Sequence, residues 1–164
     1  MMNAEPQKEH QWRQKLVGEW TSEAEAEMEL GKPAEKCKGT EVVRSLGGLW
    51  ILAEGKGEMP GGGLATMLMT LGYDPQRKRF VGTWIGSMMT HMWVYDGGLD
   101  AAGRVLTLEA EGPNMAGPEG QMAKYRDVIE LKSDGHRVLT SHMLGEDGTS
   151  RQFMTAHYRR TKSA

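Results

Sequence analysis

The sequence has little that would crosslink the chain or anchor it in a membrane. It contains one cysteine, Cys37, which excludes an internal disulfide bond. No apolar run approaches the roughly 18 residues that predict a membrane-spanning helix, and residues 1–10 are polar and lack the apolar stretch of a secretory signal. We therefore expect a cytoplasmic protein with a single domain, residues 1–164, because a chain of this length buries a sizeable core without disulfides.

The sequence also lacks a surplus of charge. It has 20 Lys and Arg against 22 Asp and Glu, a formal net charge of -2. Because nucleic acids and anionic membranes are bound through a basic surplus, we expect neither nucleic acid nor a membrane among the partners. Glycine (22 residues) and methionine (13 residues) are abundant instead. Glycine suits an all-β chain with many turns, and methionine fills irregular apolar space in a core or a binding cavity.

Helical periodicity is confined to one short segment near the N-terminus. In residues 6–16, Trp12 and Leu16 lie four positions apart, on one face together with Lys8. The segment is too short to be stable alone. It predicts an N-terminal helix that packs on the remainder of the domain, residues 17–160.

The remainder has the pattern of strands. Residues 18–29 place small or apolar residues at even positions and mostly Glu at odd positions, which predicts a strand with one buried and one solvated face. Turn sequences such as Tyr73-Asp74-Pro75 separate the strand candidates that follow. These candidates are residues 35–45, 49–56, 65–73, 79–87, 90–96, 104–111, 122–132, 137–144 and 150–160.

About ten consecutive antiparallel strands predict an all-β fold, a single up-and-down barrel, because closure leaves no free strand edge. Two glycine-rich connections, residues 55–63 and 112–120, are long enough to form flaps at the barrel mouth. A barrel of ten strands is wide enough to leave a lumen for one small apolar ligand.

Several motifs resemble known families. Gly18-Glu19-Trp20 resembles the Gly-x-Trp signature of the calycin superfamily of lipocalins and fatty-acid-binding proteins. From about Leu16 to Arg160 the chain resembles the bacterial family catalogued as domain of unknown function 1579, on these motifs: Leu71-Gly72-Tyr73-Asp74, Phe80-Val81-Gly82-Thr83-Trp84-Ile85, Gly98-Leu99-Asp100 and Tyr158-Arg159-Arg160. The resemblance implies a lipocalin-like barrel and brings no agreed substrate or activity. The sequence departs from the family pattern at Gly86, where we expect Asp.

Trp20 is the candidate for closing one end of the barrel. In an even-stranded up-and-down barrel the last strand lies antiparallel beside the first, which brings Arg159 and Arg160 near Trp20. We predict that one of these guanidinium groups stacks on the indole, held by a cation–π attraction of about 0.5–2 kcal/mol. This role is structural rather than catalytic, because a plugged end has no room for a substrate.

The two-residue turn at 134–135 predicts the register of its flanking strands. If Ser133 pairs with His136, Asp127 lies opposite His142 on the face that points inward. That face consists of Tyr125, Asp127, Ile129, Leu131, Val138, Thr140, His142 and Leu144. The Asp127–His142 pair has three interpretations: a buried pair that fixes the register, recognition of the polar head of a ligand, or a general base.

The predicted function is the binding of a small apolar or amphipathic molecule in the lumen. The predicted ligand-binding residues are Met67, Met69, Trp84, Trp93, Tyr125, Asp127, His142 and Met154. One alternative is a hydrolase or isomerase that uses the Asp–His pair, although no Ser or Cys nucleophile is placed beside it. The other is an interaction barrel without a ligand. An outward apolar patch at residues 49–52 or 84–85 would favour a homodimer.

No cofactor is predicted. Some calycin relatives hold haem through one barrel histidine, so haem is an alternative, but the five histidines lack metal-site spacings, and His91 and His157 are interpreted as surface residues. Cys37, between Lys36 and Lys38, is interpreted as a small strand residue rather than a reactive thiol. The glycines at 61–63 lack the Lys-Ser/Thr ending of a phosphate loop.

Overall fold

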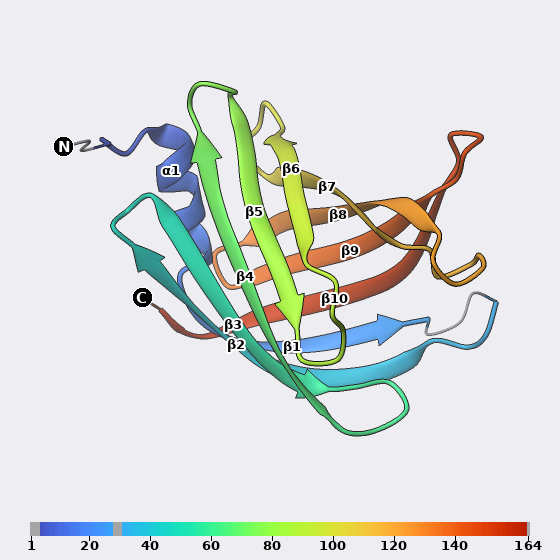
Figure 1. The fold of residues 1–164 in the computed structure, drawn as a ribbon. Coiled ribbons are helices and arrows are strands. Elements are labelled where there is room, and N and C mark those ends of the chain that lie inside the picture. The colour runs from blue at the N-terminus through green and yellow to red at the C-terminus, as the bar shows by residue number, and fades with distance from the viewer. Residues whose placement is uncertain (1–3, 28–30, 164) are drawn as a thin grey trace.

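The computed structural model describes residues 4–27 and 31–163, and its main element is a closed barrel of ten antiparallel strands. The strands are β1 (Gly18–Ala26), β2 (Glu35–Leu46), β3 (Trp50–Glu58), β4 (Leu64–Asp74), β5 (Arg79–Gly86), β6 (Trp93–Leu99), β7 (Val105–Pro113), β8 (Met122–Ser133), β9 (His136–Leu144) and β10 (Ser150–Ser163). Each strand pairs with its neighbours in the sequence, and β1 pairs with β10 to close the barrel (Figure 1).

The predicted up-and-down barrel is therefore confirmed, and every predicted strand is present with its ends moved by a few residues. The largest differences are at β6, which begins at Trp93 rather than at residue 90, and at β10, which continues to Ser163. The last two positions of the first predicted strand, Met28 and Glu29, lie outside the described residues.

The predicted N-terminal helix is present as two short pieces, α1 (Lys8–Trp12) and the 3₁₀ turn η1 (Arg13–Leu16). It covers one end of the barrel (Figure 1). Trp12 is buried and its indole donates a 2.8 Å hydrogen bond to the carbonyl of Gly103, whereas Lys8 is exposed. Arg13 is fully buried and donates to the carbonyls of Gly48 and Leu71, so the helix is tied to two further parts of the same end.

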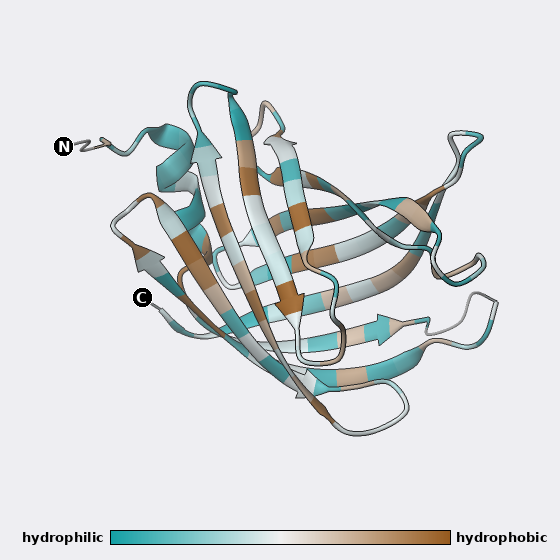
Figure 2. Ribbon diagram, viewed as in Figure 1, coloured by the Kyte–Doolittle hydropathy of each residue, from teal (hydrophilic) through white to brown (hydrophobic). Residues whose placement is uncertain are grey.

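Apolar and polar residues alternate along the strands, so that one face of each strand points into the barrel (Figure 2). The fully buried apolar side chains gather toward the end that the helix covers, which we call the closed end. They include Trp12, Leu16, Trp20, Ile51, Leu71, Phe80, Leu106 and Leu108. At the open end lie the connections β3–β4, β5–β6, β7–β8 and β9–β10, together with the last residues of β1 and the first residues of β2 (Figure 1).

No helix in residues 4–27 or 31–163 is long and apolar enough to cross a bilayer.

Candidate functional site

Trp20 fills the lumen, the interior of the barrel, at its closed end. Its indole is buried and donates a 2.9 Å hydrogen bond to the carbonyl of Leu16. The guanidinium of Arg160 lies 4.2 Å from the ring centroid of Trp20, and that of Arg137 lies 4.4 Å from it. Arg159 points outward and is exposed, so the structure does not bring it to Trp20. Sequence reasoning missed Arg137.

The predicted register of β8 and β9 is wrong beyond the turn. Ser133 does pair with His136, but a bulge between Leu131 and Ser133 leaves Lys132 without a partner. From there on every pair is shifted by one residue, and Asp127 lies opposite Ser141 rather than His142. One extra residue in a strand shifts the pairing by one position, so the side chains of the partner strand point to the face opposite to the one predicted without a bulge.

The inward face of β9 is therefore the opposite of the predicted one. Its side chains are Arg137, Leu139, Ser141 and Met143, in place of Val138, Thr140, His142 and Leu144. His142 lies on the outer face, where its Nε2 atom is 3.0 Å from the hydroxyl of Thr140. The Asp127–His142 pair is thus not formed, and the catalytic interpretation that depended on it loses its base.

Asp127 instead belongs to a polar cluster inside the lumen. The hydroxyl of Tyr95 donates a 2.6 Å hydrogen bond to its carboxylate, and Ser141 forms a second one. Burial raises the pKa of Asp127, and the two hydrogen bonds oppose this shift. Burial raises the pKa of Tyr95 as well, with a further contribution from the Asp127 charge.

A second polar group lies beside the first. Arg137 is buried and forms an ion pair with Glu41 of β2, and its guanidinium stacks 4.1 Å from the ring centroid of Tyr158. The Nη1 atom of Arg137 is buried and has no hydrogen-bond partner in the described structure. Burial raises the pKa of Tyr158, and its hydroxyl makes no hydrogen bond with any described residue. We refer to Glu41, Tyr95, Asp127, Arg137, Ser141 and Tyr158 as the polar cluster.

Apart from Asp127, the sequence reasoning did not select these residues. Glu41 carried a signal that could have been used: in β2 it alternates with Cys37, Gly39 and Val43, which are small or apolar. A charged residue on the small or apolar face of a strand predicts a buried partner of opposite charge. The bulge at Lys132 hid that partner, because it moved Arg137 from the outer face to the lumen.

Above the polar cluster, one wall of the open half is lined by bulky apolar side chains. Trp84 and Trp93 are directly paired on the inward faces of β5 and β6. Met67 and Met69 lie inward on the neighbouring strand β4, and Met69 is paired with Trp84. Tyr125 packs edge-to-face on Trp93 with their centroids 5.0 Å apart.

The opposite wall, formed by β1, β2, β3 and β10, is lined by small side chains. Most inward positions of its open half have small residues, namely Ala24, Ala26, Cys37, Gly39, Gly55, Gly57 and Ala156. Glu35 is paired with Ala26 at the mouth, and Met154 lies between Ala26 and Ser141 in the pairing. Of these, Ala24, Ala26, Cys37 and Gly39 are partly exposed although they face the lumen, as are Met67, Met69, Trp84 and Trp93 on the other wall. Solvent therefore reaches the lumen from the open end, while the closed end is packed solid.

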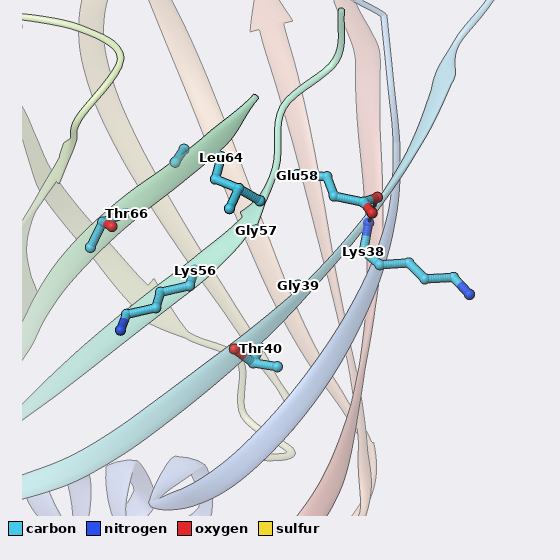
Figure 3. A pocket seen from close by; sticks show the side chains of 9 residues that line it. Lys38, Gly39, Thr40, Lys56, Gly57, Glu58, Leu64 and Thr66 are labelled. Atoms are coloured by element: carbon cyan, nitrogen blue, oxygen red, sulfur yellow. Dashed lines mark hydrogen bonds between the residues drawn. The ribbon is translucent and has the colours of Figure 1, made fainter. Parts of the chain in front are cut away.

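A separate groove lies on the outside of the barrel. Its volume is about 460 Å³, and the side chains around it point outward from β2, β3 and β4, as alternation requires (Figure 3). It is lined by Lys38, Thr40, Lys56, Glu58, Leu64 and Thr66, with Gly39, Gly57 and Ala65 at its floor. The groove adjoins the open end but does not belong to the lumen.

Neither the histidines nor Cys37 form a metal site. Within the described ranges there is no group of three or more His, Cys, Asp and Glu side chains placed to hold a metal ion. No described histidine occupies an inward strand position: His136 and His157 stack on the outer face, and His91 bonds to the carbonyl of Glu111. Cys37 faces the lumen. Burial raises the pKa of its thiol, and the charges of Glu35 and Glu58 raise it further. The flanking lysines would lower this pKa, so the shift is opposite to the one that their charge alone would produce.

The outer wall exposes apolar side chains at the positions where a homodimer patch was expected. Trp50 on β3 and Ile85 on β5, from the expected segments, are 40% and 42% exposed, and Val94 on β6, outside those segments, is 63% exposed. Trp84, in contrast, points inward. The dimer itself stays a prediction.

Comparison with known proteins agrees with the fold. The family described as protein of unknown function (DUF1579) matches residues 5–160. No curated protein matches the chain. The Mycobacterium tuberculosis protein Rv2717c has a similar structure, with 12% sequence identity, a TM-score of 0.66 and coverage of 96% of this chain and 99% of its own. EF1p2_mFAP2b, whose structure is bound to DFHBI, is similar at 11% identity and a TM-score of 0.51, with coverage of 93% and 99%.

Proposed function

The chain belongs to the family of proteins of unknown function DUF1579, and from that premise we propose that it binds one small amphipathic molecule in the open half of its lumen. The observation that carries the proposal is the polar cluster, placed inside the barrel between a solid apolar end and a partly exposed apolar end. Such an arrangement fits a molecule with a polar group at its inner end and an apolar body toward the mouth.

The polar cluster offers groups for the polar end of the ligand. Arg137 retains a buried N–H without a partner, and the Tyr158 hydroxyl is free to donate or accept. A buried donor without a partner costs about 1–3 kcal/mol, which a ligand oxygen would recover. An oxygen-containing head group, such as a carboxylic acid or an alcohol, meets these requirements.

The two walls supply room and contact for the apolar body. Ala24 and Ala156 leave space on one side because they have small side chains. Met69 and Trp84 present apolar surface on the other side, and methionine adapts to ligands of different shape. A structural neighbour bound to DFHBI is consistent with a ligand in a barrel of this kind.

Filling the small-residue wall tests the proposal. We expect decanoic acid or decanol to bind the wild-type protein in isothermal titration calorimetry. Ala24→Trp places an indole in the lumen and should weaken binding at least about tenfold, equivalent to about 1.4 kcal/mol. Glu23→Trp adds the same group on the outer face of the same strand and should leave affinity within about twofold. Equal effects of the two variants, or no binding of either probe by the wild type, would contradict a lumenal site.

A further inference from the structure

We infer that three loops on one side of the barrel mouth form an apolar lip that docks on a phospholipid surface. The lip consists of residues 59–64, 87–92 and 114–122, which comprise the connections β3–β4, β5–β6 and β7–β8 together with the first residues of β4 and β8, Leu64 and Met122 (Figure 1). The inference goes beyond the proposed ligand site, and docking does not require that site to be occupied.

Large apolar side chains in the lip are exposed to an unusual degree. Loop tips in a water-soluble surface are normally polar, yet this region exposes Leu64 (81%), Met88 (37%), Met89 (42%), Met92 (54%), Met115 (42%) and Met122 (55%). Exposed apolar groups gathered in one region mark a surface that meets an apolar partner.

The lip is also nearly free of charge. Among its residues, Glu119 is the one Asp, Glu, Lys or Arg. The β9–β10 connection at the same end differs, since it carries Glu146 and Asp147. The β9–β10 side of the mouth is therefore acidic, whereas the lip has one charged residue of its own and one charged neighbour, Glu35, whose carboxylate accepts a hydrogen bond from the backbone N–H of Gly61. This difference indicates that the lip is the side that would enter an interface.

Two features favour lipid over a protein partner. The apolar groups stand on separate loops instead of one flat face, and methionine side chains are flexible enough to enter a fluid layer. In addition, Lys38 and Lys56 border the groove next to Leu64 (Figure 3).

These two lysines supply charge complementarity to lipid phosphates. Neither forms an ion pair with a described residue, and the groove's own carboxylate, Glu58, accepts a 3.1 Å hydrogen bond from the backbone N–H of Lys38. With Leu64 inserted among acyl chains, the lysine side chains can extend along the outer wall to the headgroup phosphates.

The lip is continuous with the lumen. The indole N–H of Trp93, on the inward face of β6, lies 3.0 Å from the sulfur of Met89 in the lip. A docked lip would open the lumen onto the lipid, where amphipathic molecules are concentrated. This differs from the two membrane interactions that the sequence argues against, a spanning segment and a basic surface.

Flotation with vesicles of pure phosphatidylcholine tests docking. We expect the wild-type protein to float with the vesicles and Met92→Glu/Met122→Glu to lose at least about tenfold in partition coefficient. The matched control is Val42→Glu/Leu46→Glu, which adds the same charge at residues that are 48% and 54% exposed on β2, toward the closed end. The control should float like the wild type.

Failure of the wild type to float, or equal loss by the lip and control variants, would overturn the inference. Thermal unfolding checks that both variants are folded. Decanoic acid titration without vesicles separates this test from the ligand proposal: the lip variant should still bind the probe, whereas Ala24→Trp should lose the probe and still float.

Discussion

Asp127 is a half-buried carboxyl group that lies against Tyr95 and Ser141 inside the lumen. Its pKa is raised by burial, so the folded protein keeps a proton that the unfolded chain has already lost. The free energy of unfolding should therefore fall as the pH rises from about 4, the pKa of an unfolded Asp, toward the raised folded pKa.

Replacing Asp127 tests this directly. Asp127→Asn keeps an acceptor for Tyr95 but cannot ionise, so its stability relative to wild type should improve between pH 4 and pH 7 in urea unfolding. Asp96→Asn should show the opposite trend, and at lower pH, because Arg79 and Arg77 lower the pKa of Asp96: its stability relative to wild type should fall as the pH rises from that lowered pKa to about 4 and stay constant above. Asp96 is partly exposed, so losing its charge should cost at most about 1 kcal/mol at pH 7, and nothing once the pH falls below its folded pKa. The same pH trend for both variants would contradict the assignment.

The Glu41–Arg137 ion pair gives a second prediction at the scale of the residue. Glu41→Gln leaves the buried Arg137 without an anionic partner and should lower the free energy of unfolding by about 3 kcal/mol. Replacing both residues by Met removes the charges together and should cost less than Glu41→Gln alone. Chemical unfolding measures the free energy of unfolding of both variants. A larger decrease in the double variant than in Glu41→Gln would contradict this prediction, because the ion pair would then stabilise the fold more than two apolar side chains do.

The bulge in β8 is the element that decides which residues face the lumen. The turn at 134–135 was predictable from Asp-Gly chemistry, and so was the inward face of β8, because Tyr125, Ile129 and Leu131 alternate with polar residues. The bulge carries no glycine and interrupts no obvious pattern. The register of β9, and with it the polar cluster, was therefore beyond what spacing alone could show.

Deleting the bulged residue tests its role. With Lys132 removed, Leu131 and Ser133 become consecutive and can pair with Arg137 and His136 as they already do. Its contact with Glu130 is an exposed ion pair of little value. The deletion should therefore cost less than about 2 kcal/mol.

Deletion of Glu130 is the matched control, because it would also remove the bulge but would turn Leu131 outward and bring Lys132 into the lumen opposite Arg137. We expect it to lower the thermal stability more than the deletion of Lys132 does, because it exposes an apolar side chain and places a lysine beside a buried arginine. Equal tolerance of the two deletions would mean that the register is not set at Lys132.

At the scale of the whole molecule, the barrel is divided along its axis. The closed end combines the helix, Trp20 and a solid apolar core, as the short amphipathic helix and the Gly-x-Trp motif led us to expect. The open end combines small inward residues, bulky apolar residues and an uncharged lip. From the composition we predicted that methionine fills irregular apolar space in a core or a cavity. The division into a packed closed half and a partly exposed open half depends on the register of all ten strands, which composition does not give.

The central claim is that a small amphipathic molecule enters the open half of the lumen. The most direct measurement is the ¹³C-methyl methionine spectrum of the wild-type protein titrated with decanoic acid, with signals assigned by single Met→Leu variants. The account predicts saturable shifts of Met67, Met69 and Met154, which line the lumen. Shifts confined to the exposed Met92, Met115 and Met122, or no shifts at all, would contradict it.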